Sequence, residues 1–183
     1  MTDRLRLALV YGSVREGRFC ETVAGWAAAE IERRPEFAID IVDPAADWPA
    51  IDEARLRRQL AAADAAIVVT PEYNHSFPGP LKMVIDSIGA EWRTRPVAFV
   101  SYGGQSGGLR AVEHLRGVFT ELEAVAIRET VSFAQAWELF GRNGRPVDEF
   151  RSGRAMRTML DQLAWWARLL KAGREQGVRD QAA

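Results

Sequence analysis

Residues 5–20 read LRLALVYGSVREGRFC, and this stretch decides the fold. Its first seven residues contain an unbroken apolar run, which predicts a strand buried on both faces, as in a parallel sheet. After a polar turn, residues 19–34 predict a helix, because apolar side chains recur there at a spacing of four, as at Val23, Ala27 and Ile31. The chain therefore opens with a buried strand, a turn and a helix.

The rest of the chain repeats this alternation. Further strands are expected at residues 37–42, 65–70, 96–102 and 125–131, and further helices at residues 51–63, 79–88, 109–122 and 148–171. Strict alternation predicts parallel strands joined by right-handed crossovers, with helices on both faces. Five strands in this length match an α/β, flavodoxin-like doubly wound sheet of order 2-1-3-4-5. We expect residues 1–183 to form one such domain, irregular at 134–147 and frayed over about the last ten residues.

Composition narrows the classes of function. Hydrophobic residues make up 48% of the chain, enough for one large core, and the single cysteine, Cys20, fits a reducing cytoplasm. A formal net charge of -1 gives no general attraction to nucleic acid or to an anionic membrane. The N-terminus lacks the apolar segment of a signal peptide, and no apolar run reaches the ~20 residues of a membrane helix. We expect a cytoplasmic protein that binds no nucleic acid, no membrane and no metal.

Three loops are the places to look for a ligand. In such a sheet a ligand binds beyond the carboxyl ends of the strands, at the switch point between the first and third strands. The loops that reach this point follow the first, third and fourth strands, which are neighbours in the expected order. These are also the three most unusual loops in the sequence, so we predict a ligand site where they meet.

The first loop, residues 12–20, has the features of an anion site. Free backbone N–H groups and the helix dipole favour an anion there, Ser13 offers a hydroxyl, and Arg15 offers two N–H donors to a phosphate. Arg18 would oppose the helix dipole by roughly 0.3–1 kcal/mol, and a bound phosphate would reverse the sign of that effect. The alternative is that both arginines are solvated loop residues.

Two familiar phosphate motifs are excluded in this loop. Gly12 and Gly17 have the glycine spacing of a P-loop, but Arg18-Phe19 stands where that motif has Lys-Ser/Thr, so a nucleoside triphosphatase is disfavoured. No G-x-G-x-x-G pattern follows the first strand, which disfavours a Rossmann dinucleotide domain.

The second loop, residues 70–79, suits a planar ring. A carboxylate, an aromatic face, an amide and an imidazole stand together at Glu72, Tyr73, Asn74 and His75. Such a mixture suits a heteroaromatic ring with donors and acceptors along its edge. The alternative is a turn in which the Asn caps the next helix and the Tyr packs on the core.

The third loop, residues 101–108, contains four glycines, so its main chain can approach a ligand edge and expose N–H groups to it. The alternative is a tight connection between a strand and a helix. Four glycines cost more conformational entropy than such a turn requires, so we favour a binding role.

At these three loops the chain resembles the NAD(P)H-dependent FMN reductase family, which includes azoreductases, quinone reductases and chromate reductases. The resemblance covers roughly residues 5–133, and its most specific part is the Pro-Glu-Tyr-Asn element after a buried strand. The matching segments are Gly12-Ser13-Val14-Arg15 with Gly17-Arg18, Pro71-Glu72-Tyr73-Asn74-His75-Ser76 running into Pro80-Leu81-Lys82, and Ser101-Tyr102-Gly103-Gly104 with Gly107-Gly108.

The resemblance implies a site for FMN, with NADPH or NADH as co-substrate, in a homodimer or homotetramer whose partner subunit helps to close the site. The first loop would cradle the FMN phosphate, through Ser13, Arg15, Gly17, Arg18, Phe19 and Cys20. The second loop would lie against the isoalloxazine ring, through Pro71, Glu72, Tyr73, Asn74 and His75, and the third would contact its pyrimidine side, through Ser101, Gly103 and Gly104. Many members carry Ser or Asn at the positions of Arg18 and Cys20, which leaves these two side-chain contacts open.

The expected activity is hydride transfer from NAD(P)H to bound FMN, then electron transfer to a small acceptor such as a quinone, an azo compound or free flavin. Because the flavin is the reactive centre, no catalytic side chain is assigned. Two alternatives stay open: an FMN-binding electron carrier or redox sensor that does not oxidise NAD(P)H, and an interaction module without a cofactor.

The tryptophans are expected to serve structure before chemistry. We place Trp26, Trp137, Trp165 and Trp166 in the core or in a subunit interface. Trp165 and Trp166 lie ~100° apart on a helix, so both cannot face one core, and one of them faces a partner subunit or a loop.

Overall fold

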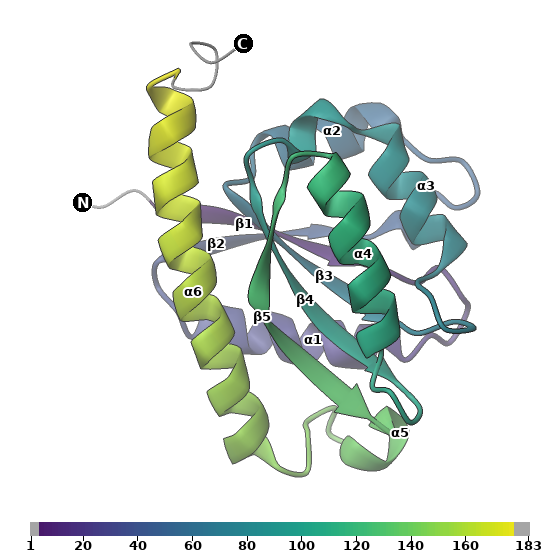
Figure 1. Ribbon diagram of the computed structural model, residues 1–183. Helices are drawn as coiled ribbons and strands as arrows, with labels where there is room; N and C mark the ends of the chain where they lie inside the picture. Colours follow the sequence, from purple (N-terminus) through teal and green to yellow (C-terminus); the bar gives the residue numbers. More distant parts are fainter. Residues whose placement is uncertain (1–3, 178–183) are drawn as a thin grey trace.

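The computed structural model describes residues 4–177, which form a five-stranded parallel sheet with helices on both faces (Figure 1). The strand order β2-β1-β3-β4-β5 confirms the flavodoxin-like order expected from the sequence. The strands are β1 (Leu5–Tyr11), β2 (Phe37–Val42), β3 (Ala65–Pro71), β4 (Pro96–Gly103) and β5 (Val125–Ala134). The helices are α1 (Cys20–Glu32), α2 (Glu53–Ala61), α3 (Gly79–Ser87), α4 (Leu109–Glu121), α5 (Ala136–Leu139) and α6 (Glu149–Glu175), with short 3₁₀ turns η1 (Pro44–Ala46) and η2 (Ala90–Trp92).

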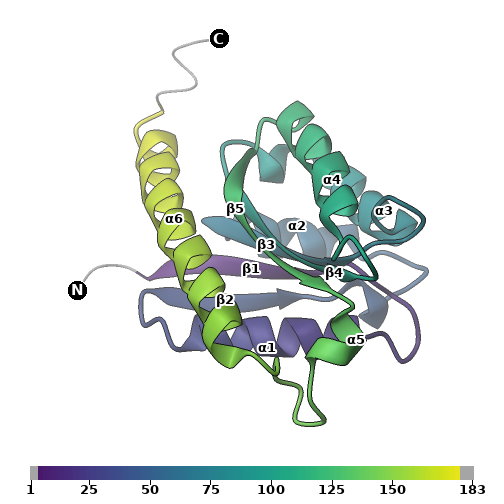
Figure 2. The ribbon, with the colours of Figure 1, turned by 60° about the horizontal axis from the view of Figure 1, so that its bottom comes forward.

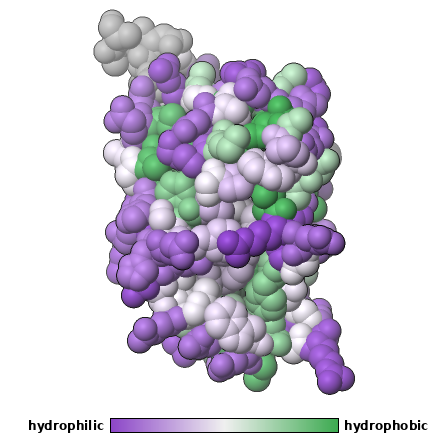
Figure 3. Space-filling model, turned by 90° about the vertical axis from the view of Figure 1, so that its right-hand side faces the viewer, coloured by the Kyte–Doolittle hydropathy of each residue, from purple (hydrophilic) through white to green (hydrophobic). Residues whose placement is uncertain are grey.

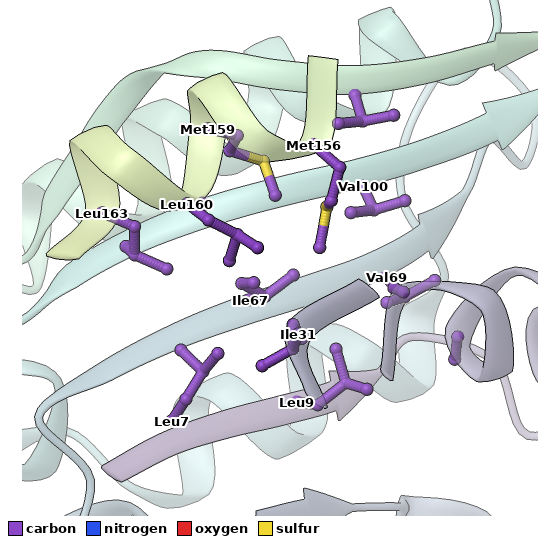
Figure 4. Packing of buried hydrophobic residues seen from close by; sticks show 14 of the residues in the cluster. Leu7, Leu9, Ile31, Ile67, Val69, Val100, Met156, Met159, Leu160 and Leu163 are labelled. Carbon is purple, nitrogen blue, oxygen red and sulfur yellow. The ribbon is translucent and has the colours of Figure 1, made fainter. Parts of the chain in front are cut away.

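Helices cover both faces of the central strands (Figure 2). On one face α1 and α6 pack over Leu7 and Leu9 of β1, and Met156 of α6 points into this core (Figure 4). On the other face α2, α3 and α4 pack over Ala8 and Val10 of the same strand. Successive residues of β1 therefore belong to opposite cores, which explains why its sequence lacks polar alternation.

The end of β5 and the segment after it differ from the sequence prediction. β5 continues to Ala134, which pairs with Gly103 at the end of β4. The segment expected to be irregular, residues 134–147, contains the one-turn helix α5. The structure thus extends the sheet toward the edge at which the ligand loops lie.

α6 is longer than predicted. It continues past Lys171 to Glu175, so the first part of the tail that was expected to fray is helical, and residues 178–183 lie outside the described residues. None of the helices within residues 4–177 combines the length and the apolar character that crossing a membrane requires.

The tryptophans divide between the core and the surface. Trp26 is buried, with the edge of its ring against Phe133. Trp166 packs against the core, whereas Trp165 is exposed, which confirms that the two rings cannot share one core. Trp137 is also exposed and therefore lies outside the core.

The face on which α3 lies mixes side chains of opposite character. Apolar patches are visible there, but hydrophilic side chains separate them from one another (Figure 3). This view therefore shows no single continuous apolar surface.

Candidate functional site

Two of the three candidate loops are joined by direct side-chain contacts. The Ser13 hydroxyl, which is buried, lies 2.8 Å from the Tyr73 hydroxyl. The guanidinium carbon of Arg15 lies 3.7 Å from the centre of the Tyr73 ring. Because β1 and β3 are neighbours, the loops that follow them meet at one edge of the sheet, as the strand order predicts.

The first loop begins with a close approach of two backbones. The amide of Gly12 donates to the carbonyl of Val69 at 2.8 Å, which continues the β1–β3 pairing by one step. A Cβ at Gly12 would lie 2.7 Å from that carbonyl oxygen, so no other residue fits without movement of the main chain. Glycine here seats the start of the loop against β3.

Arg18 has partners that the sequence did not suggest. Its side chain is only 5% exposed and forms a two-pronged ion pair with Asp43, which follows β2. It also contacts Glu21 at 3.3 Å and donates to the Ser13 carbonyl. Arg18 precedes Phe19, the residue before α1, so it lies next to the helix start and not in the first helical turn. The two carboxylates offset the unfavourable effect of a cation at that position.

The side chains of Phe19 and Cys20 belong to the core. The Phe19 ring packs against Tyr102 and Phe140. The Cys20 thiol is buried, lies 3.6 Å from the carbonyl of Val69, and has its pKa raised by that burial. The two side chains therefore face the core, and the contact with a phosphate that was predicted for these two residues is left to their backbone amides.

The N-terminus of α1 fits an anion. Phe19 is the residue that precedes the helix, and no side chain caps it. An uncapped helix start leaves N–H groups without partners inside the helix. Gly17, at φ +60°, shapes the turn before it, and a Cβ there would meet nothing within 4 Å. The loop therefore combines open amides with the exposed cation of Arg15.

The second loop is a tight reversal between Tyr73 and Ser76. The Tyr73 amide donates to the Ser76 carbonyl at 2.8 Å, and the Ser76 amide donates back at 3.1 Å. Asn74 and His75, between them, adopt φ values of +50° and +68°, a conformation that residues other than glycine rarely adopt. Asn74 does not cap α3, so the capping alternative is wrong, and both residues are exposed at the site.

Glu72 connects the second loop to the third. Its side chain is 9% exposed and accepts hydrogen bonds from the Ser106 hydroxyl and from Arg110, the latter at 2.9 Å. Burial works to raise the pKa of Glu72, but these hydrogen bonds and the Arg110 charge outweigh it, and the pKa lies below its ordinary value. Ser106 in turn accepts from the Gly108 amide at 3.3 Å. An ionised Glu72 therefore holds the shape of the third loop.

The third loop folds back on the sheet because of its last two glycines. Gly107 and Gly108 have φ values of +64° and +85°, and a Cβ on either would clash with Ser132 or Ser101. The Ser101 hydroxyl is buried and donates to the Gly107 carbonyl at 2.8 Å. The Ser101 side chain therefore anchors the loop, and the predicted contact of Ser101 with a ligand is left to its main chain.

Gly103 and Gly104 lie where the third loop approaches its neighbours. A Cβ on Gly103 would lie 3.4 Å from Glu72, and one on Gly104 would lie 3.7 Å from the exposed ring of Trp137. The Gly104 carbonyl accepts from the amides of Gly107 and Gln135. The loop is thus held from both sides.

Sequence reasoning missed several residues that shape this edge of the sheet. Asp43 follows β2, and Ser132 belongs to β5, so both lie outside the three loops. Ser106 lies inside the third loop, but the interpretation of that loop rested on its glycines alone. No local pattern marks them, because their roles come from contacts across the fold. Within residues 4–177, no three His, Cys, Asp or Glu side chains gather into a group that could hold a metal ion.

Comparison with known proteins gives a consistent result. Residues 5–138 match the family model described as NADPH-dependent FMN reductase. The chain is 34% identical over 121 residues to an NAD(P)H-dependent FMN reductase of Schizosaccharomyces pombe, a match that covers 56% of this chain and 60% of that protein. It is 30% identical over 186 residues to the 2-hydroxy-1,4-benzoquinone reductase of a Burkholderia species, covering 90% of this chain and 97% of that protein.

Solved structures share the fold. FerB, a flavoenzyme NAD(P)H:(acceptor) oxidoreductase from Paracoccus denitrificans, superposes with a TM-score of 0.69 at 22% sequence identity. The superposition covers 90% of this chain and 97% of that chain. The arrangement of sheet and helices is therefore shared over almost the whole length of both.

Proposed function

This chain belongs to the NADPH-dependent FMN reductase family, and we propose that it binds FMN at the three loops, oxidises NADPH or NADH, and reduces a small acceptor. The observation that carries the proposal is the junction of Ser13, Arg15 and Tyr73 beside an uncapped helix start. It offers a phosphate-binding turn next to an aromatic, tightly folded loop, which are the two halves of an FMN site.

The first loop is the proposed phosphate site. Arg15 supplies a charge-assisted donor, and the amides around Gly17, Phe19 and Cys20 supply the partial positive charge of a helix start. The buried Ser13 hydroxyl is hydrogen-bonded to the Tyr73 hydroxyl, so within the first loop it serves to position the Tyr73 ring. The donors of Arg18 are already engaged by Asp43, Glu21 and the Ser13 carbonyl.

The second and third loops are the proposed isoalloxazine site. The main chain at Pro71, Glu72 and Gly103 lies at the ends of two adjacent strands, where amide and carbonyl groups can meet the edge of a ring. Bound FMN supplies the hydride-accepting chemistry, so the protein needs to orient the reactants and exclude water. The exposed Asn74 and His75 form the rim of this surface.

The acceptor is proposed by chemical class. The similar Burkholderia protein is named as a benzoquinone reductase, which favours a quinone as the acceptor, with azo compounds and free flavin as further members of the same class of small planar oxidants. We propose a single FMN-binding domain that works in the cytoplasm as a homodimer or homotetramer. Light scattering on the purified protein tests the assembly directly.

Anaerobic absorption spectroscopy tests the central proposal. Purified protein mixed with FMN should show flavin bands near roughly 375 and 450 nm that bleach when NADPH or NADH is added. Bleaching, followed by recovery of the bands on addition of a quinone, is the expected result. Bands that persist with both nucleotides would favour an electron carrier or sensor, and absence of flavin binding would overturn the assignment of all three loops.

A further inference from the structure

The guanidinium of Arg18 is fully occupied within the protein. A guanidinium has five N–H donors. Nη1 donates to the Ser13 carbonyl and to Asp43 Oδ1 at 2.8 Å, and Nη2 donates to Asp43 Oδ2 at 2.5 Å and to Glu21 at 3.3 Å. Nε donates to the same Glu21 oxygen at 3.3 Å. Every donor therefore has an acceptor, and a phosphate could use one only by displacing it.

Asp43 is itself held in place. Its Oδ1 accepts from the Ala45 amide at 3.0 Å, which caps the short turn η1 after β2. The parallel register pairs Val10 with Val42, so Asp43 stands beside the start of the first loop although 25 residues separate it from Arg18 in sequence. One carboxylate thus fixes both the end of β2 and the side chain of Arg18.

We propose that Arg18 and Asp43 form a brace that fixes the first loop in its FMN-binding shape, and that Arg18 is a positioning residue and not a phosphate ligand. This inference rests on the proposed function. Its geometric basis is the hydrogen bond from Arg18 to the Ser13 carbonyl, inside the loop, together with the two-pronged contact to Asp43, outside it.

The brace also determines where one amide of the loop points. In a trans peptide the carbonyl of one residue and the N–H of the next point in opposite directions. Because the Ser13 carbonyl points to Arg18, the N–H of Val14 points away from it. That donor is turned from the guanidinium and remains for an anion. A loop ordered before binding also avoids the entropy cost of ordering it with the ligand.

The two possible roles of Arg18 predict opposite effects of one substitution. If Arg18 bound the phosphate, Asp43 would compete with FMN for its donors, and Asp43→Asn would tighten FMN binding. If Arg18 and Asp43 form a brace, the same substitution loosens the loop and weakens binding. The sign of the change therefore separates the two roles.

The experiment compares FMN with riboflavin, which lacks the phosphate, by quenching of flavin fluorescence. For Asp43→Asn we expect the Kd for FMN to rise roughly tenfold, equivalent to about 1.4 kcal/mol. The Kd for riboflavin should change by less than about twofold, because the brace shapes only the phosphate loop. A general loss of structure would instead weaken both ligands, and that result would overturn the proposal.

Glu21→Gln is the matched control. It removes a carboxylate charge from the same guanidinium but leaves the contact with Asp43 intact, and the Glu21 side chain is 67% exposed. We expect its FMN affinity to stay within about twofold of the original protein, since exposed ion pairs contribute little. Weakening as large as that of Asp43→Asn would show that charge alone, and not the brace, controls affinity.

Arg18→Lys gives an independent test. A lysine ammonium keeps the charge but cannot span Asp43 and the Ser13 carbonyl with a planar fork. We expect FMN binding as weak as in Asp43→Asn, and no further loss in the double variant, because both remove one interaction. Unchanged or tighter binding in Asp43→Asn would overturn the brace alone. An original protein that binds no FMN would overturn the proposed function, and the brace with it.

Discussion

Arg15 is the cation that the first loop leaves for a ligand. Its guanidinium lies over the face of Tyr73, and no carboxylate of residues 4–177 forms an ion pair with it. A cation on a ring face is held in position by the ring, yet the N–H groups at its edge stay free. Arg15 is therefore poised for a phosphate in a way that Arg18 is not.

Arg15→Ala should weaken FMN binding roughly tenfold to a hundredfold, the usual worth of a hydrogen bond to a charged group. Fluorescence titration with FMN measures this change. Arg154→Ala, which removes an exposed arginine of α6, serves as the control and should leave the affinity unchanged. Unaltered FMN affinity in Arg15→Ala would remove Arg15 from the phosphate site.

Substitution of Gly12 and of Gly25 by alanine should change stability in opposite directions. Gly12→Ala would bring a methyl group within 2.7 Å of the Val69 carbonyl and should lower the free energy of unfolding by about 1–3 kcal/mol. Gly25→Ala, inside α1, would meet nothing within 4 Å and should raise it by about 0.5–1 kcal/mol. Urea denaturation of the two variants measures both changes. A stable Gly12→Ala protein would contradict the close approach of β1 and β3.

Individual residues also show what the sequence could not predict about the site. Local motifs singled out Ser13, Arg15 and Tyr73, because each belongs to a loop that follows a buried strand, and the structure brings the three side chains together. The partner of Arg18 could not be found in this way, because Asp43 reaches it only through the β1–β2 register. The burial of Cys20, in contrast, has a local sign, because Cys20 stands three and seven positions before Val23 and Ala27 and so lies on the apolar face of α1.

At the scale of elements, the edge strand β5 contains an irregularity whose carbonyl groups are hydrogen-bonded by one side chain of α4. The register between β4 and β5 shifts, so that residues 127–129 of β5 bulge. Arg116 of α4 donates to three carbonyls there, those of Ala126 at 3.4 Å, Ile127 at 2.7 Å and Arg128 at 3.0 Å. A guanidinium therefore replaces the ladder hydrogen bonds that the bulge loses.

Arg116→Met keeps the apolar stem but leaves these carbonyls unpaired, so we expect the free energy of unfolding to fall by about 1–3 kcal/mol. Arg128→Ala is the control, because that side chain is 94% exposed and should change stability by less than about 0.5 kcal/mol. Chemical denaturation of both variants gives the comparison. Equal stability of the two would show that water satisfies the bulge without Arg116.

The stability that Glu72 gives to the contact between the second and third loops depends on pH. The pKa of Glu72 in the folded protein lies below its ordinary value, so its contacts with Ser106 and Arg110 stabilise the fold above that ordinary value and are lost as pH falls through the lowered pKa. Unfolding free energies measured between about pH 6 and about pH 3 should fall less steeply for Glu72→Gln than for the original protein. Identical slopes would contradict an ionised Glu72 at this joint.

The elements themselves were largely predictable, and the exceptions have a common cause. β1 and β2 begin and end as the sequence predicts, because each is a short run of strand-forming residues bounded by polar residues, although β2 is an edge strand. β5 is an edge strand with mixed burial, so its extension to Ala134 was not visible in the pattern. α5 is a single turn, too short to show a helical period.

For the molecule as a whole, cofactor binding and folding are one equilibrium. FMN that binds only the folded chain, at about 100 times its Kd, should stabilise it by about 2.7 kcal/mol. For a chain of this size each kcal/mol raises Tm by about 2–4 °C, so a rise of roughly 5–11 °C is expected by calorimetry. At the same FMN concentration the Tm of Asp43→Asn should rise by less, because a larger Kd reduces the stabilisation that the ligand provides. No shift in the original protein would contradict binding to the folded state and would leave the three loops without their proposed ligand.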